Sequence, residues 1–341
     1  MEIILPTGRR TTRLGFGCAF PRSVSKNDAA RYLDAAFDAG IRHFDVAPAY
    51  GDGAAEEYLG DFLKRHSGGI TVTTKYGILP TAMRPFHVRV ARTVLTPVLL
   101  TLRRVPAIAS RLSTLASAMN ISSKAAFCAA EAKISLERSL QELQLDTVDM
   151  FLMHEPSVAD LGDDLLTFLS DCVASRRIGA FGIGGDASRA PDLYRKRRPF
   201  CDVMQFDWTV FSPEFDFPGS FRIHYWVFSR RLRDVHRALM DRPDICRRWS
   251  AETDLNLAEV RTLTDVMLKA ALTRHRDSIV LFTSSKPNNI IRNVAVAEDT
   301  KLEKHALRFC ELIKHESADL WVARSKDGLD AVSNPVPDLR H

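Results

Sequence analysis

Short apolar runs recur eight times along the chain, and most of them are followed by a stretch with the periodicity of a helix. Near-continuous apolar character is typical of strands that are buried on both faces of a parallel sheet. Strands that alternate with helices predict a parallel sheet covered by helices, and eight such units close a (β/α)8 TIM barrel. The runs are residues 13–18, 41–46, 70–75, 148–154, 180–185, 202–208, 221–228 and 278–284.

The length of the chain agrees with a single barrel. It has 341 residues, and one barrel typically takes about 250 residues plus insertions. No internal repeat or low-complexity tract indicates a second unit. We therefore expect one domain over residues 1–341.

Helical patterns occupy several of the intervals between strands. The first is expected at 26–39, where Ser25 and Asp28 have the spacing of a capping box and Gly40 follows the last turn. Further helices are expected at 54–66, 122–143 and 161–176.

Four regions depart from this alternation. A long insertion at about 80–121 follows the third strand, and it should border the active-site face, because the βα loops of a barrel lie there. Residues 209–220 leave little room for a helix. Residues 229–277 are predicted to form two helices separated by Pro243, Trp249 and a polar stretch, and an extra C-terminal helix and tail are expected at about 301–341.

The net charge of +5 is concentrated around the insertion. Residues 81–124 contain seven cations and no Asp or Glu: Arg84, Arg89, Arg92, Arg103, Arg104, Arg111 and Lys124. This pattern favours a solvated lid element, with membrane-surface or partner binding as the alternative. Because the rest of the chain sums to −2, the sequence does not indicate a nucleic-acid-binding protein.

Cysteine usage and the N-terminal sequence predict a cytoplasmic protein. The six cysteines are scattered without a CxxC pair, which is typical of reduced thiols rather than of disulfides or a zinc site. The start MEIILPTGRR does not read as a signal peptide, and no stretch approaches the roughly 20 apolar residues of a membrane span. His154 and Glu155 lack the second histidine of HExxH, so no metal site is expected.

Four polar residues stand at or just beyond the ends of predicted strands: Asp45, Tyr50, Lys75 and His154. Strand C-termini of a barrel open onto one face, so these side chains should converge there. The segments HFDVAPAYGDGAAEEYLG, TTK and MHEP, taken together, resemble the aldo-keto reductase superfamily. The resemblance covers about 13–79 and 122–299 and implies a nicotinamide-dependent enzyme that reduces carbonyl compounds.

The four residues suit proton donation to a carbonyl oxygen. Tyr50 is predicted as the general acid, and a nearby Lys75 ammonium should lower its pKa from a usual value of about 10. Asp45 would keep Lys75 charged, and His154 would hydrogen-bond the substrate oxygen or share the proton transfer. The alternative is structural: an Asp45–Lys75 ion pair between neighbouring strands, a turn tyrosine and a core histidine.

A cofactor site is expected after the eighth strand, in FTSSKPNNIIRNV. Loop hydroxyls, a lysine and a helix N-terminus make a plausible phosphate cradle. The resemblance implies cofactor contacts from this segment, with Lys286 or Arg292 in place of a family arginine where this chain has Asn289. The candidate residues are Ser284, Ser285, Lys286, Asn289, Arg292 and Asn293.

The resemblance also points to residues that hold the nicotinamide. Gln205 matches the glutamine that binds the carboxamide, and Phe228, or else Tyr225, is the candidate for stacking on the ring. The Ser-Asn pair that is usual after the fifth strand is replaced by Gly184 and Gly185. No glycine cluster in the chain completes the GxGxxG motif of a dinucleotide fold.

The prediction is therefore an NAD(P)H-dependent aldo-keto reductase that reduces an aldehyde or ketone. NADP(H) is the preferred cofactor and NAD(H) the second choice, and a small carbonyl compound is the expected partner of a monomer or weak homo-oligomer. Two alternatives stay open: a sugar or aldose dehydrogenase that works in the oxidative direction, and a non-catalytic, cofactor-binding regulatory subunit.

Overall fold

Eight parallel strands close into a barrel in the computed structural model, which describes residues 1–66, 68–80 and 124–321. The order around the barrel is β10-β3-β4-β5-β6-β7-β8-β9, so each strand neighbours the one before it in the chain. All eight predicted strands are confirmed, and so is the (β/α)8 barrel. The strands are β3 (Leu14–Gly17), β4 (His43–Asp45), β5 (Thr71–Tyr76), β6 (Val148–His154), β7 (Ile178–Gly185), β8 (Val203–Asp207), β9 (Phe221–Tyr225) and β10 (Ser278–Phe282).

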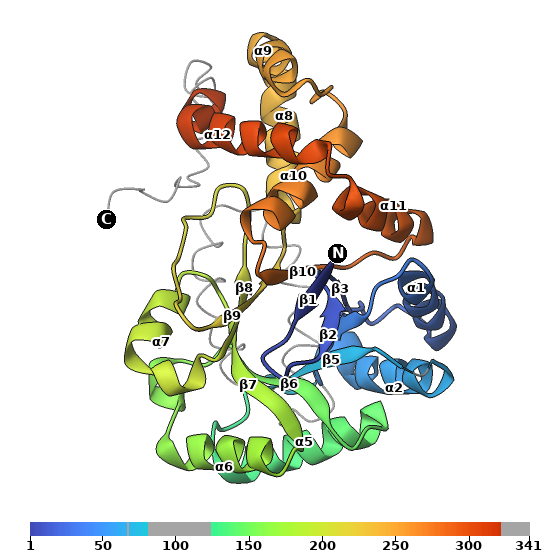
Figure 1. Cartoon of the computed structure of the whole chain (residues 1–341), viewed down its shortest axis with the longest axis vertical. Coiled ribbons are helices and arrows are strands. Elements are labelled where there is room, and N and C mark those ends of the chain that lie inside the picture. The colour runs from blue at the N-terminus through green and yellow to red at the C-terminus, as the bar shows by residue number, and fades with distance from the viewer. Residues whose placement is uncertain (67, 81–123, 322–341) are drawn as a thin grey trace, which may run out of the picture.

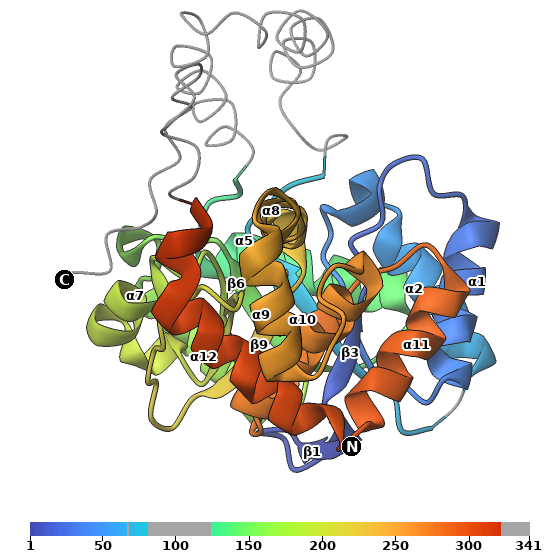
Figure 2. The ribbon, with the colours of Figure 1, turned by 90° about the horizontal axis from the view of Figure 1, so that it is seen from above.

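Helices surround the barrel, as Figure 1 shows. They are α1 (Lys26–Asp38), α2 (Ala55–Arg65), α5 (Ala129–Leu143), α6 (Asp163–Ala174), α7 (Ala190–Lys196), α8 (Ser229–Asp241), α9 (Pro243–Thr253), α10 (Val260–Arg274), α11 (Pro287–Glu298) and α12 (Leu302–Trp321). The predicted cap of the first helix is present, because the Ser25 hydroxyl accepts a hydrogen bond from the Asp28 amide at 3.2 Å. Figure 2 shows α12, the expected extra helix, lying across α9 and α10, against which it packs.

Two helix predictions need correction. Residues 229–277 form three helices rather than two, because Pro243 begins α9 and Trp249 lies inside it. Proline is accepted at the first position of a helix, where its missing N–H leaves no bond unmade. The helix expected from residue 122 begins only at Ala129. The insertion predicted at about 80–121 falls almost entirely within 81–123, and it lies outside the described residues, as does the tail 322–341.

A hairpin that the sequence pattern did not indicate covers the N-terminal end of the barrel. It consists of the antiparallel strands β1 (Glu2–Ile4) and β2 (Arg10–Thr12). Leu5, in its turn, packs among the residues that fill the barrel. Arg9 donates a hydrogen bond to Asp149 at 2.7 Å, which ties the hairpin to the start of β6. The barrel is therefore closed at this end.

Side chains alternate between the barrel interior and the helical layer. The interior is filled mainly by Leu5, Met150, Leu152, Ala180, Val203, Ile223, Ile279 and Leu281. The interior is tightly packed, because a Cβ added at Gly182 would lie 2.0 Å from the Val203 carbonyl oxygen. The interior is thus a packed core and not a pore.

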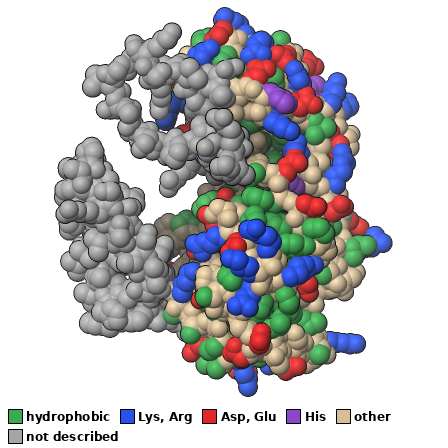
Figure 3. All heavy atoms as spheres, turned by 90° about the vertical axis from the view of Figure 1, so that its left-hand side faces the viewer, with side chains coloured by type: hydrophobic (Ala, Val, Ile, Leu, Met, Phe, Trp, Pro, Cys, Tyr) green, Lys and Arg blue, Asp and Glu red, His purple; other side chains and the backbone are tan. Residues whose placement is uncertain are grey.

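The described surface mixes both signs of charge. On the face seen in Figure 3, basic and acidic side chains are interspersed rather than gathered in a patch of one sign. No helix among the described residues is long and apolar enough to span a bilayer. Within the same part of the chain, no cluster of three or more His, Cys, Asp or Glu side chains has the arrangement of a metal site.

Candidate functional site

The structure brings Asp45, Lys75, Tyr50 and His154 together at the C-terminal end of the barrel. Asp45 ends β4 and His154 ends β6, while Lys75 lies on β5 between them. The Lys75 Nζ is 2.5 Å from Asp45 Oδ1 and 5.0 Å from the centre of the Tyr50 ring. The rings of Tyr50 and His154 meet edge to face, with their centres 6.1 Å apart. Residues from three separate segments of the sequence thus form one cluster.

Tyr50 reaches the cluster from a short turn, η1 (Tyr50–Gly53), that follows β4. Gly51 and Asp52 adopt left-handed backbone angles, with φ of 59° and 61°, which turn the chain from the strand into α2. Glycine adopts such angles without a steric cost. Asp52 is also held by Arg22 at 2.8 Å. The sequence YGDG therefore fixes how Tyr50 enters the C-terminal opening of the barrel, called the mouth below.

Lys75 and Asp45 form a buried ion pair, with exposed fractions of 2% and 3%. Burial alone would lower the pKa of Lys75, but the charge of Asp45 and the neighbouring Tyr50 outweigh it, so the pKa is raised. Lys75 also donates a hydrogen bond to the Val46 carbonyl oxygen at 3.1 Å. The lysine is therefore a fixed cation at neutral pH.

The pKa of Tyr50 is raised, which corrects the simple expectation of a lowered value. Burial is the largest cause, Lys75 opposes it, and Asp45 adds to the rise. The predicted effect of Lys75 is present, but desolvation of the phenolate exceeds it. Tyr50 is consequently a protonated phenol at neutral pH.

His154 is a neutral imidazole. Burial, then the charges of Lys75 and Lys124, lower its pKa to about 3. A neutral imidazole still carries one N–H and can donate one hydrogen bond. The residue after it, Glu155, has a left-handed φ of 55°, and its amide donates to the Gly184 carbonyl oxygen at 2.5 Å. Such a backbone angle at a non-glycine residue has no local sequence signal, and the sequence therefore did not predict it.

Gln205 and Tyr225 line the same mouth from β8 and β9. The Gln205 side-chain amide donates to Asp45 Oδ2 at 2.7 Å. Tyr225 packs against the residues inside the barrel, and its hydroxyl donates to the Gly185 carbonyl oxygen at 2.8 Å. Phe228, the first choice for stacking, is the residue before α8, and its partly buried side chain packs against the hydrophobic core. The arrangement therefore favours Tyr225 as the ring beside a bound ligand.

The predicted phosphate cradle lies at the N-terminus of α11. The Ser284 hydroxyl accepts a hydrogen bond from the Lys286 amide at 3.2 Å, and the exposed Lys286 is the residue before the helix. Ser285 and Asn289 are exposed beside it, whereas Asn293 is buried. Arg292 points elsewhere, because its guanidinium makes a two-bonded ion pair with Asp265 of α10. Of the two cations, Lys286 is the one available to a phosphate.

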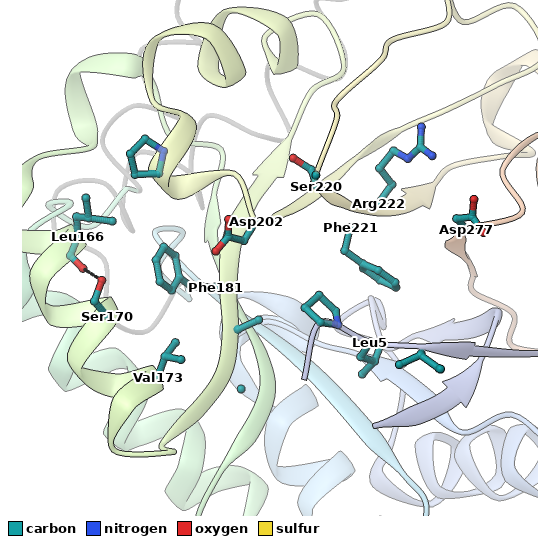
Figure 4. Close-up of a pocket in the computed structure, with 16 residues that line it drawn as sticks. Leu5, Leu166, Ser170, Val173, Phe181, Asp202, Ser220, Phe221, Arg222 and Asp277 are labelled. Atoms are coloured by element: carbon teal, nitrogen blue, oxygen red, sulfur yellow. Dashed lines mark hydrogen bonds between the residues drawn. The ribbon is translucent and has the colours of Figure 1, made fainter. Parts of the chain in front are cut away.

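A second concavity lies away from this cluster. It has a volume of about 930 Å³ and is lined by the N-terminal ends of β7 and β9, the segment before β8, the hairpin turn and α6. Figure 4 shows Phe181, Phe221 and Leu5 around it, with Asp202, the residue before β8, and Arg222 of β9. None of the four clustered residues contributes to its lining. It lies at the end of the barrel that the β1–β2 hairpin covers.

Comparisons with known proteins agree with this geometry. The model of the aldo/keto reductase family matches residues 13–213. A pyridoxal 4-dehydrogenase from Microbacterium luteolum is 43% identical over 82 residues, which cover 23% of this chain and 24% of that protein. A D-threo-aldose 1-dehydrogenase from a Pseudomonas species is 30% identical over 185 residues, covering 52% of this chain and 51% of that protein. The matches thus span about a quarter and about half of these relatives.

Solved structures share the fold over most of the chain. The structure of a glycerol dehydrogenase from Gluconobacter oxydans superposes with a TM-score of 0.64 at 16% identity, covering 98% of this chain and 99% of that one. An aldo-keto reductase from Klebsiella pneumoniae in complex with NADPH superposes with a TM-score of 0.58 at 17% identity, covering 90% and 94%. At these identities the likeness concerns the fold.

Proposed function

The chain belongs to the aldo/keto reductase family, and from that premise we propose that it is an NAD(P)H-dependent oxidoreductase that reduces an aldehyde or ketone to an alcohol. The observation that carries the proposal is the buried Lys75–Asp45 pair, which lies beside Tyr50 and a neutral His154. A protonated phenol, a fixed cation and an imidazole N–H at one open end of the barrel suit a carbonyl oxygen that becomes an alkoxide.

The residues at the mouth fit a nicotinamide cofactor. Gln205 offers amide donors and an acceptor, and Tyr225 offers an aromatic face. Ser284 and Lys286 stand at a helix N-terminus, where backbone N–H groups and the helix dipole favour phosphate. The reduced cofactor would supply the hydride. The proposed cofactor is NADPH, with NADH as the second choice, because Lys286 gives a cation for a 2′-phosphate.

The protein side of the reaction is proton transfer and charge stabilisation. Tyr50 donates its phenolic proton to the carbonyl oxygen as negative charge develops there. Lys75 lowers the cost of the phenolate that remains, and Asp45 keeps Lys75 charged and in place. His154 donates a hydrogen bond to the same oxygen and orients the substrate. The sequence-based roles of the four residues are thus retained in the proposal.

Oxidation of an alcohol or a sugar is the second candidate. The two curated relatives are named dehydrogenases, one for pyridoxal and one for aldoses. The same groups serve both directions, since the phenolate of Tyr50 would accept the proton that it donates in reduction.

Steady-state rates with both cofactors decide between these functions. We expect consumption of NADPH with at least one member of a panel of aldehydes, and faster reduction than oxidation at neutral pH. Faster formation of NADPH or NADH with aldoses or alcohols would favour the dehydrogenase. Tight cofactor binding without turnover in either direction would favour a regulatory subunit.

A further inference from the structure

Gln205 reaches across the whole barrel to Asp45. The two residues lie on β8 and β4, which are four strands apart in a ring of eight and therefore face each other. The Nε2 of Gln205 nevertheless donates to Asp45 Oδ2 at 2.7 Å, and both side chains are 3% exposed. Lys75 occupies the other oxygen of Asp45. Both oxygens of the carboxylate are thus held, one from each side of the mouth.

Gly184 leaves the space in which the Gln205 amide lies. The two residues are direct neighbours in the β7–β8 ladder. A Cβ added at Gly184 would lie 3.1 Å from Gln205 Oε1, which is tighter than ordinary carbon–oxygen contact. Any side chain at this position would therefore push the amide end of Gln205. The glycine at position 184 and the placement of the Gln205 amide therefore go together.

We infer that Gln205 is a positioning residue for the proton donor: its amide fixes the Asp45 carboxylate and takes up part of its charge, and thereby sets how strongly Lys75 acts on Tyr50. The inference rests on the proposed function and deepens it. An amide has two N–H donors and one acceptor oxygen. Only one N–H is used by Asp45, so the remaining groups can bind a carboxamide at the same time. One side chain would then join the cofactor site to the proton donor.

The size of the effect follows from the burial of the pair. A hydrogen bond to a charged group is stronger than one between neutral groups, and a buried carboxylate oxygen that loses its donor keeps more charge on itself. The charge of Asp45 raises the pKa of Tyr50. Loss of the Gln205 amide should therefore raise the pH at which Tyr50 ionises. We expect a shift of about 0.5–1 pH unit, since only part of the lost interaction reaches the phenol.

The test is a titration of Tyr50 that needs no turnover. Tyrosinate absorbance is followed against pH in the wild type and in Gln205→Met, and the same titration of Tyr50→Phe is subtracted to isolate Tyr50 from the other five tyrosines. Gln144→Met is the matched control, because Gln144 donates to Asp61 in the same way on the surface, at 3.2 Å. We expect an upward shift for Gln205→Met and none for the control.

Gly184→Ala is the second variant, because its methyl group presses on the Gln205 amide without removing it. It should raise the midpoint of the Tyr50 titration by less than Gln205→Met does. If Gln205→Met does not fold, the titration of Gly184→Ala tests the inference on its own. Unchanged midpoints in the folded variants would overturn the inference, even if NADPH binding is weakened, because Gln205 would then serve the cofactor alone. A shifted midpoint in a protein that turns over no carbonyl compound would support the positioning role and reject the proposed function.

Discussion

The hydroxyl of Thr74 donates a 2.6 Å hydrogen bond to the carboxyl group of Glu56. This contact ties the first turn of α2, just after the Tyr50 turn, to the strand residue that precedes Lys75. Glu56 is 2% exposed, and its burial raises the pKa of the carboxyl group to about 7. A buried acid with a pKa near neutrality thus lies on the elements next to Tyr50 and Lys75.

From the burial of Glu56 we predict how Glu56→Gln changes the stability of the protein at different pH values. A folded-state pKa raised above the unfolded value of about 4.5 gives a stability that is complete below pH 4.5 and is lost as the pH rises through 7. Glutamine stays neutral and keeps an acceptor for Thr74. The variant should therefore be more stable than the wild type at pH 8 by about 1–3 kcal/mol, and equal to it near pH 4. Urea unfolding at both pH values measures the difference, and a constant difference between them would contradict the assignment.

Tyr50→Phe should lose most of the turnover and keep the cofactor. Removal of a general acid costs about 10² to 10⁴ in rate, whereas the phenyl ring keeps the packing against His154. Steady-state kcat and NADPH fluorescence titration give the two quantities. Tyr58→Phe is the control, because Tyr58 packs between helices on α2. If Tyr50→Phe retained a near-normal kcat, Tyr50 would not be the acid.

Lys75→Met should reduce kcat and move the alkaline limit of the pH–rate profile upward, because Lys75 lowers the pKa of Tyr50. The variant also leaves a buried carboxylate without its cation, and breaking such a pair costs about 3–5 kcal/mol. Adding Asp45→Asn should restore most of that stability without restoring the rate. Thermal unfolding and pH–rate profiles of the single and double variants separate the two effects. A double variant as active as the wild type would make the pair purely structural.

Lys286→Ala should weaken NADPH binding more than NADH binding, if Lys286 contacts the 2′-phosphate. Arg292→Ala should instead lower the stability of the protein and affect both cofactors equally, because Arg292 is held by Asp265. Dissociation constants for both cofactors and melting temperatures of both variants test this pair. Selective loss of NADPH in Arg292→Ala alone would reverse the assignment of the two cations.

The sequence alone determined the barrel and the position of the four clustered residues. Apolar runs and helical periodicity are local properties, and the end of a run marks the strand end where Asp45 or His154 must stand. Local chemistry also identified the cap at Ser25 and the hydroxyl-rich segment before α11. In such cases the structural role of each residue can be predicted from neighbours a few positions away in the sequence.

The partners of these residues, in contrast, depend on the three-dimensional fold. Gln205 meets Asp45, and Arg292 meets Asp265, across elements whose relative placement no sequence spacing specifies. The pKa of Tyr50 depends on how much water the folded mouth excludes, so burial reversed the direction expected from Lys75 alone. Desolvation and long-range contacts arise from the packing of the whole chain, so neither can be predicted from a local sequence pattern.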